Sequence, residues 1–534
     1  MAFLASRHLL LPAALLCTLV QATPAPTAQP DSHAPSLISP KDPLITPSAV
    51  EYHATRTYKH RRDIFDDFAN EVNSILGELG SNIPSYVASG IPNFFEGFPT
   101  GDDVQSSLGL DDAQVSALPT QVLNVDPYAN FTSQGWNVRF HGNVYKQPDT
   151  SKETLNDLAN VFLIDVDIED LPTSQQKQAR NLTASIFVLQ QGDVNVSTIH
   201  IEPSSGQGSS GEPGGGGATE ATGGAQDVQL PYLTTDQGDF DVFVQIDSNG
   251  LMNGNETQQI QRMNTHVEGA SLGNSTAYLV PDEGITVISD VDDILRVTKI
   301  YQPEEGLLNS FARPFRPWMN MPDVYANWSR SLPDIHFHYL TTTPEQVTRN
   351  YMEFIYSTYP GGSFDTRPLN FSNWEETLHV RSFLLDRIFE TFPNRKFVLV
   401  ADTSNSDVMT DYPALVKQYP GSVQCILLRN TSATDPSDRF PYNTAGFEGL
   451  DQRKFMFFRT PDDLFNLDLA AGECYNTSVA QNLTFGYQGL PLNLDDPAPI
   501  NGSSGGSSNA VSSSHAQLGL TFSAFLGTLL WQLL

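Results

Sequence analysis

The sequence predicts an α/β fold whose C-terminal half is a Rossmann-like parallel sheet, preceded by an all-β, sandwich-like domain. From Gly284 onward, short β-branched runs alternate with amphipathic helical runs, which is typical of a parallel sheet covered by helices. Residues 121–282 instead hold alternating polar and apolar runs separated by turn residues, which predicts strands. A chain of 534 residues is long enough for two or three such domains.

Charge and composition exclude some classes of function. The formal net charge is −32, and the acidic residues are scattered along the chain. Nucleic-acid binding needs a basic surface, so we expect no nucleic-acid partner. Loose adsorption to anionic membranes is disfavoured for the same reason. Hydrophobic residues make up 39% of the chain, which is enough for real cores, and we expect a soluble protein suited to acidic or extracellular surroundings.

The N-terminal region has the pattern of a secreted protein. Residues 1–22 predict a signal peptide, because Arg7 and His8 precede an apolar run that ends near the small residue Ala22. Residues 23–62 are rich in Pro, Ala, Ser and Thr and are predicted to be disordered. Their last four residues are basic and mark either a propeptide cleavage site or a chance cluster. Residues 63–120 predict a helical lead-in.

The C-terminal region predicts a surface anchor. Residues 481–517 form a polar linker, and residues 518–534 are apolar to the last residue. Small residues, a polar spacer and an apolar tail are typical of a glycosylphosphatidylinositol anchor signal; a tail-anchored membrane helix is the alternative. A glycosylated surface is predicted from eleven Asn-x-Ser/Thr sequons, at Asn130, Asn181, Asn195, Asn255, Asn274, Asn327, Asn370, Asn430, Asn476, Asn482 and Asn501. We therefore expect a cell-surface protein of the secretory pathway.

Two cysteines, Cys425 and Cys474, remain once the predicted signal peptide with Cys17 is removed. In an oxidising compartment they form either one disulfide or two separate buried thiols. Within the predicted β-domain, residues 203–226 are dominated by Gly, Ser, Glu and Ala and predict a flexible loop. His141, within an alternating run, is predicted to be a strand residue rather than a ligand.

The stretch Gly284–Thr298 organises the C-terminal half. A buried strand is predicted at Ile285–Asp290, and carboxylates follow at Asp290, Asp292 and Asp293. The carboxyl ends of parallel strands are where open α/β sheets bind ligands. Clustered oxygen ligands suit Mg²⁺. Further strands are predicted at 335–340, 396–401, 423–428 and 454–458, with helices at 344–359, 382–392 and 411–419.

The spacing of Asp290 and Asp292 resembles the first motif of the haloacid dehalogenase superfamily of phosphatases. The resemblance implies a sheet of that type, with Asp290 as the nucleophile that becomes an aspartyl-phosphate and Asp292 as the acid/base. It also implies a hydroxyl, a cation and an acidic pair at the ends of later elements. Thr341 is the expected phosphate contact, since Thr343 is predicted to cap the following helix.

Arg381, just before the helix predicted at 382–392, takes the position where the superfamily has Lys. Asp402 and Asp407 have the spacing of its acidic pair, so the implied Mg²⁺ ligands are Asp290, the backbone carbonyl of Asp292 and Asp402, with Asp407 placing the metal's waters. Departures from the motifs occur at Ile294, Arg381 and Ala401. His336 and His338, two residues apart on a strand, are predicted to be packing residues rather than zinc ligands.

A closer resemblance is to the catalytic domain of the actin-patch-associated phosphatidate phosphatase family. The segments that carry it are Ile288–Asp293, Phe311–Phe315, Phe337–Leu340 and Phe392–Phe397, within about residues 284–458. It implies Mg²⁺-dependent conversion of phosphatidate to diacylglycerol and phosphate, with a phospholipid or other phosphomonoester as substrate. The alternative is a surface glycoprotein that keeps the fold but has little or no activity.

The connection between Asp290 and the strand at Ile335 is roughly forty residues long, which exceeds an ordinary link between a strand and a helix. The resemblance implies that a small insertion there leaves the site open to a phosphate displayed on a membrane or on a large molecule. Within it, Arg313 and Arg316 are expected to offset the negative field of the chain. Phe315 and Trp318 are expected either to touch lipid or to pack inside.

Overall fold

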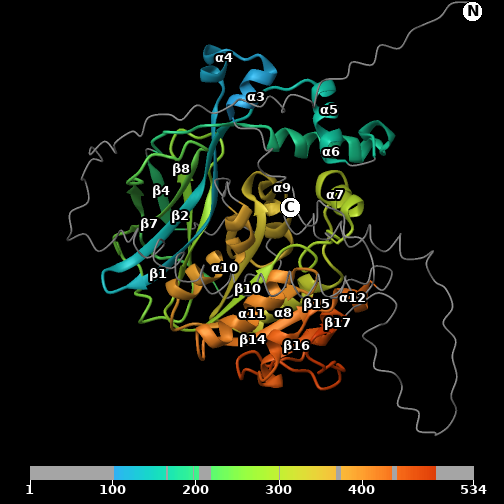
Figure 1. Cartoon of the computed structure of the whole chain (residues 1–534). Coiled ribbons are helices and arrows are strands. Elements are labelled where there is room, and N and C mark those ends of the chain that lie inside the picture. The colour runs from blue at the N-terminus through green and yellow to red at the C-terminus, as the bar shows by residue number, and fades with distance from the viewer. Residues whose placement is uncertain are drawn as a thin grey trace, which may run out of the picture. The chain divides into compact units, whose positions relative to one another are not determined.

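The computed structural model describes residues 101–163, 166–196, 198–203, 218–299, 301–367, 374–435 and 442–488. They form two large β-sheets with helices around them (Figure 1). The predicted signal peptide, leader and anchor tail lie outside the described residues. So do most of the linker and the centre of the predicted loop at 203–226, whose C-terminal end forms the short strands β5 and β6.

A six-stranded parallel sheet forms the centre of the C-terminal half, which confirms the α/β class with a parallel sheet. Its strand order is β12–β11–β10–β13–β14–β16, and every neighbouring pair is parallel. The bounds are β10 Ile285–Asp290, β11 Ile335–Pro344, β12 Ser363–Arg367, β13 Lys396–Asp402, β14 Val423–Arg429 and β16 Phe455–Phe458. Of these strands, only β12 is not predicted from the sequence.

Helices cover both faces of this sheet. Side chains of α8 and α9 pack against Val287 and Val398 on one face, while α10 and α11 pack against Ile288 and Leu399 on the other. Neighbouring residues of a strand point to opposite faces, so each strand supplies both cores. The helices of this half are α7 Pro303–Phe311, α8 Met321–Ser331, α9 Glu345–Thr358, α10 Trp374–Thr391, α11 Ser406–Gln418, α12 Thr431–Thr434 and the 3-10 turns η2 Ala445–Phe447, η3 Gln452–Lys454 and η4 Pro461–Leu464.

The direction of the chain through this sheet reverses between β10 and β13. From β10 the chain moves outward to β11 and β12, and from β13 it moves outward on the other side to β14 and β16. In open α/β sheets such a reversal leaves a crevice at the carboxyl ends of the two central strands, and ligands bind there. Asp290 ends β10 and Asp402 ends β13, so the topology brings both carboxylates to this crevice.

The second sheet has nine strands and is mostly antiparallel. Its main order is β3–β2–β1–β9–β8–β4–β6, with β7 paired to β2 and β5 paired to β8. Its strands are β1 Thr120–Thr132, β2 Gly135–Lys146, β3 Leu189–Gln190, β4 Ile199–Pro203, β5 Thr219–Glu220, β6 Gln226–Val228, β7 Asp239–Gln245, β8 Gln261–Val267 and β9 Ser275–Val280. A separate ladder joins β15 Tyr442–Asn443 to β17 Tyr487–Gln488.

The structure does not confirm an all-β domain at 121–282, because two α-helices and one 3-10 turn interrupt the strands. These are α5 Lys152–Phe162, η1 Ile168–Asp170 and α6 Thr173–Ile186. The alternating pattern of residues 184–202 predicts a strand, but in the structure this run begins inside α6. Apolar side chains of α5 and α6, such as Ala159 and Ile186, pack with Phe311 of α7 in a cluster of their own. Of the predicted lead-in, the described part holds α3 Gly101–Leu108 and α4 Asp112–Ala117.

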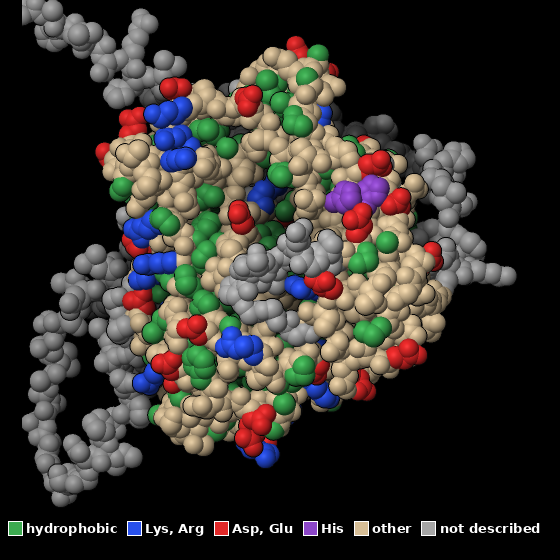
Figure 2. All heavy atoms as spheres, turned by 180° about the vertical axis from the view of Figure 1, so that it is seen from behind, with side chains coloured by type: hydrophobic (Ala, Val, Ile, Leu, Met, Phe, Trp, Pro, Cys, Tyr) green, Lys and Arg blue, Asp and Glu red, His purple; other side chains and the backbone are tan. Residues whose placement is uncertain are grey.

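Acidic side chains are spread over the face shown in Figure 2. This agrees with the scattered positions of Asp and Glu in the sequence. No helix in the described part of the chain is long and apolar enough to cross a bilayer.

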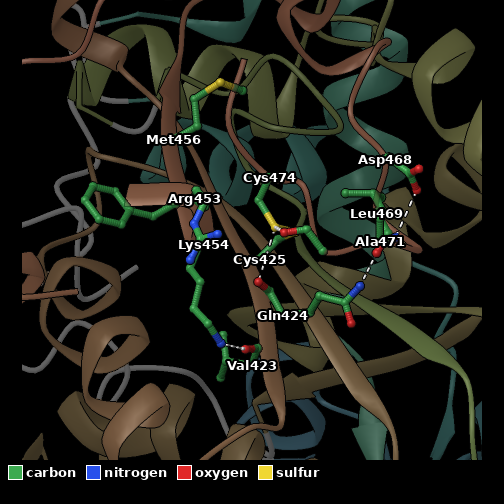
Figure 3. Close-up of a disulfide and its surroundings, with 12 residues drawn as sticks. Val423, Gln424, Cys425, Arg453, Lys454, Met456, Asp468, Leu469, Ala471 and Cys474 are labelled. Atoms are coloured by element: carbon green, nitrogen blue, oxygen red, sulfur yellow. Dashed lines mark hydrogen bonds between the residues drawn. A yellow bond between two sulfur atoms is a disulfide. The ribbon is translucent and has the colours of Figure 1, made fainter. Parts of the chain in front are cut away.

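Cys425 and Cys474 form a disulfide, which decides between the two alternatives that the sequence leaves open (Figure 3). Cys425 lies in β14 and Cys474 lies in the loop beyond η4, with their Cα atoms 5.4 Å apart and both residues buried. The side-chain amide of Gln424 donates a hydrogen bond to the carbonyl of Leu469 in the same loop. Together these links attach the loop after η4 to the parallel sheet.

Candidate active site

Asp290 lies at the carboxyl end of β10 and is almost completely buried. Its Oδ1 accepts a hydrogen bond from the backbone N–H of Val291 at 2.9 Å. Its Oδ2 lies 3.1 Å from Nη2 of Arg381 and accepts a 3.1 Å hydrogen bond from Nδ2 of Asn405. Burial raises the pKa of Asp290 to about 8, and the charge of Arg381 acts in the opposite direction. A bound cation would favour the ionised form of this carboxyl group.

Asn405 joins Asp290 to the second buried carboxylate of the crevice. Its Nδ2 also donates to Oδ1 of Asp402 at 3.0 Å, so one amide group lies between the two acids. Oδ2 of Asp402 accepts hydrogen bonds from the hydroxyl of Thr431 at 2.7 Å and from the backbone of Ser404 at 3.1 Å. Burial raises the pKa of Asp402. Asn405 is absent from the residues predicted from the sequence, although it lies between Asp402 and Asp407.

Arg381 links Asp290 to the third acid, Asp407. Its Nε donates to Oδ2 of Asp407 at 2.8 Å, while Nη2 faces Asp290. Burial lowers the pKa of Arg381, but its two carboxylate partners outweigh burial and hold the pKa well above the usual range. The sequence places Arg381 before a helix; α10 begins at Trp374, so Arg381 lies inside the helix.

Asp292 is held by hydrogen-bond donors on both oxygens. Oδ1 lies 2.7 Å from Nη2 of Arg296 and accepts a 2.7 Å hydrogen bond from the hydroxyl of Thr298. Oδ2 has only longer contacts of 3.4 Å, with the hydroxyls of Thr341 and Thr343. Thr343 is predicted to cap the next helix; in the structure its hydroxyl donates to Asp292. Oδ2 is therefore the oxygen of Asp292 more weakly held by the protein.

Asp293, the third carboxylate of the stretch, supports the loop after β10. Its backbone adopts a left-handed conformation with φ of 58°, which is uncommon for a residue other than glycine. Its Oδ1 accepts hydrogen bonds from the backbone N–H groups of Thr298 and Lys299 at 3.1 and 2.8 Å. The side chain of Asp293 thus stabilises the turn that positions Asp292.

The carboxylate oxygens of the crevice are the kind of ligand that a hard divalent cation prefers. The described side chains do not, however, surround a position where such an ion would sit. In the described part of the chain, no group of three or more His, Cys, Asp and Glu side chains is arranged to hold a metal ion. Asp290 and Asp402 are nevertheless two buried carboxylates that share a single amide donor. Burying two such groups without a cation is costly, and oxygen ligands suit Mg²⁺.

The nine-stranded sheet contacts the helix that carries Arg381. Arg139 of β2 binds Asp241 of β7 at 2.7 Å and Asp365 of β12 at 2.6 Å. Asp241 also lies 2.6 Å from Nη1 of Arg387 in α10. His338, predicted to be a packing residue, is buried with its Nε2 2.9 Å from Oδ2 of Asp365. His336, the other histidine of this pair, is likewise buried, with its Nε2 3.0 Å from Oγ of Ser363.

The long connection after Asp290 contains α7 and α8 and packs largely inward. Trp318 is buried against Phe458, and the guanidinium of Arg429 lies 4.3 Å from the centre of its ring. Phe315 is partly buried and packs against Tyr351. Of the two roles expected for Trp318, contact with lipid or packing inside, the structure supports packing. Arg313 forms an ion pair of 2.6 Å with Glu305.

Comparison with known proteins finds a family that this segment resembles. Residues 285–430 match the family model described as the catalytic domain of phosphatidate phosphatase APP1, which confirms the predicted family resemblance. Phosphatidate phosphatase APP1 of Saccharomyces cerevisiae is 25% identical over 162 residues, covering 29% of this chain. The match spans only 27% of that relative. Both matches are to a phosphatidate phosphatase, which belongs to the hydrolases that act on phosphate esters.

Proposed function

We propose, from the match of residues 285–430 to the catalytic domain of phosphatidate phosphatase APP1, that this protein is a Mg²⁺-dependent phosphatidate phosphatase of the haloacid dehalogenase type. The observation that carries the proposal is the position of Asp290. Its Oδ2 faces Arg381 and is joined through Asn405 to Asp402, at the point where the strand order reverses. The residues proposed as nucleophile, fixed cation and second acid therefore lie close together at the carboxyl edge of the sheet, which supports the proposal.

In the proposed reaction, an oxygen of Asp290 forms a bond to phosphorus while the bond from phosphorus to the glycerol oxygen breaks. Asp292 donates a proton to the leaving alkoxide, giving diacylglycerol and an aspartyl-phosphate. Asp292 then accepts a proton from the water that attacks the aspartyl-phosphate, which releases phosphate and restores Asp290. The weakly held Oδ2 of Asp292 suits this exchange of a proton.

The remaining residues bind and orient the phosphate. Arg381 stabilises negative charge near the nucleophile, and the hydroxyl of Thr341 contacts the phosphate. Asp290, the backbone of Asp292 and Asp402 would hold Mg²⁺, with Asp407 beside them. The ion would supply positive charge that offsets the carboxylates and the phosphoryl oxygens.

The alternative function is a surface glycoprotein without turnover, suggested by Ile294, Arg381 and Ala401. Ile294 and Ala401 are fully buried among apolar side chains, so these two departures change packing rather than charged groups. Arg381 keeps a positive charge 3.1 Å from Asp290. We therefore favour the enzyme.

A covalent intermediate tests the chemistry. When the protein is mixed with phosphatidate labelled at phosphorus and quenched in acid, the label should stay on the wild-type chain and be released by hydroxylamine, which cleaves acyl phosphates. The Asp290→Asn variant should carry no label. Label that persists in this variant, or that resists hydroxylamine, would exclude Asp290 as the nucleophile.

We further propose that the protein acts at the cell surface, held by a lipid anchor that replaces residues 518–534. Treatment of cells with phosphatidylinositol-specific phospholipase C should then release the protein, and a chain lacking residues 518–534 should be secreted. Retention of the shortened chain on the membrane would contradict the anchor.

A further inference from the structure

We propose a second metal site, distinct from the crevice, at His200 and His266 on the nine-stranded sheet. β4 and β8 are antiparallel neighbours, and their register places His200 directly opposite His266. Residues directly opposite each other in such a pair have side chains on the same face and only about 5 Å between their Cβ atoms. The fold therefore brings two imidazoles together from positions 66 residues apart in the sequence.

Both histidines lie on the solvent side of the sheet. Their neighbours Ile199, Ile201 and Val267 are buried in the core, and alternation along a strand directs His200 and His266 the other way. Of the described histidines whose side chains are placed, these two are the ones that are not buried. Figure 2 shows histidine side chains exposed beside acidic ones on the face it presents. A metal ion can reach the pair directly from solution.

The two rings lie close together and nearly parallel, and rotation about their side-chain bonds would turn one nitrogen of each ring towards a shared ion. Their centres lie 4.5 Å apart, and their planes are inclined by 29°. A carboxylate orients one of them, since Oδ1 of Asp227 lies 2.6 Å from Nδ1 of His200. Asp227 lies opposite His200 in the β4–β6 pair. A carboxylate on one ring nitrogen orients the ring and leaves Nε2 available to a metal, as is usual for histidine ligands.

The chemistry of this pair selects a transition metal. Imidazole nitrogen suits Zn²⁺, Cu²⁺ or Ni²⁺, whereas the carboxylates of the crevice suit Mg²⁺. Glu202 is exposed and follows His200 by two residues on the same face of β4, and Glu268 is exposed in the turn just after β8. Both add negative charge near the pair. No described group of three or more His, Cys, Asp and Glu side chains forms a metal cage. The protein therefore supplies two nitrogens, and water completes the coordination.

Titration of the full-length protein with Zn²⁺ in an isothermal calorimeter tests the site. The wild type should bind one more equivalent of Zn²⁺ than His200→Gln or His266→Gln, because loss of either ring removes chelation. At least about a tenfold loss of affinity is expected, since the second ligand acts at a high effective concentration. Combining both substitutions should cause no further loss. Asp227→Asn should weaken binding by roughly 10-fold or more, because an amide oxygen is a weaker acceptor than the carboxylate and leaves the ring of His200 less basic.

A matched control separates this effect from a change in net charge. Asp247→Asn removes the same charge from an exposed position without contacting the imidazoles and should leave the affinity unchanged. With Cu²⁺, pulsed electron paramagnetic resonance should detect imidazole nitrogen in the wild type, and less of it after His266→Gln. The proposal is overturned if His200→Gln and His266→Gln bind Zn²⁺ with the stoichiometry and affinity of the wild type.

Discussion

Arg381 and Asp290 form a buried ion pair at the crevice, with Nη2 of the arginine 3.1 Å from Oδ2 of the aspartate. The same guanidinium group binds Asp407 through Nε at 2.8 Å. Arg381 thus holds a fixed positive charge beside the proposed nucleophile, where charge develops during phosphoryl transfer. A planar group with several donors can bind two acids at once, which a lysine in the same place cannot do equally well.

Arg381→Ala is expected to reduce kcat/KM for phosphatidate by about 100-fold or more, because a charge aimed at the transition state is lost. Arg381→Lys should retain more activity than the alanine variant, since it keeps the charge. The control is Arg330→Ala, which removes an exposed cation from α8. Equal rates for the wild type and Arg381→Ala would show that another group supplies the charge.

Asn405→Ala is expected to weaken Mg²⁺ activation. Without the shared amide donor, the two carboxylates of Asp290 and Asp402 lose the group that now separates them. Loss of such a supporting hydrogen bond commonly costs about 10- to 100-fold in metal affinity or activity. The Mg²⁺ concentration that gives the half-maximal rate should therefore rise. The value of kcat at saturating Mg²⁺ should be less affected. An unchanged Mg²⁺ dependence would contradict this role for Asn405.

His141 is expected to make the fold sensitive to acid. Burial lowers the pKa of His141 to about 3, and the charge of Arg139 acts in the same direction. An unfolded histidine titrates near 6.5, so between these values the unfolded chain binds more protons than the folded one. The stabilisation is therefore complete above about pH 6.5 and is lost as the pH falls towards 3.

The free energy of unfolding, measured in denaturant from pH 7 to pH 4.5, should fall more steeply for the wild type than for His141→Asn. Comparison of the two chains removes the contribution of other titrating groups. Parallel curves for the two proteins would mean that His141 does not lose a proton on folding in this range.

The disulfide is expected to stabilise the fold. It joins residues 49 positions apart, and closing a loop of that size in the unfolded chain contributes about 4 kcal/mol in the chain-entropy model. A protein with both cysteines replaced by alanine should have a lower midpoint of thermal unfolding. Reductant should lower the midpoint of the wild type but leave that of the double variant unchanged. If reductant changes both proteins equally, the disulfide is not the cause.

The main strands, and the positions of Asp290 and Asp402 at strand ends, were predictable from the sequence because local patterns determine them. β10 has the predicted bounds, since an apolar β-branched run lies between Gly284 and Asp290. Helix α10 starts eight residues before the predicted 382, at Trp374, in a stretch with neither glycine nor proline. The family resemblance implies a cation at the start of a helix, so the predicted helix begins just after Arg381. In the structure the helix runs through Arg381, because nothing in residues 374–381 interrupts it.

Features that depend on distant partners were not predictable. β12 reads Ser-Phe-Asp-Thr-Arg, which is too polar for a buried strand by pattern alone. It is buried because partners far along the chain bind its polar groups, as Arg139 and His338 bind Asp365. The role of Asn405 depends likewise on Asp290, which lies 115 residues away in the sequence.

Phosphate release from phosphatidate in vesicles, with and without Mg²⁺, tests the central claim most directly. The wild type should release phosphate only with Mg²⁺ and should leave diacylglycerol in the vesicles. Asp290→Asn, which keeps the shape of the side chain but cannot attack phosphorus, should release none while remaining folded. Wild-type release that does not depend on Mg²⁺, or a folded Asp290→Asn variant with near wild-type activity, would contradict the account.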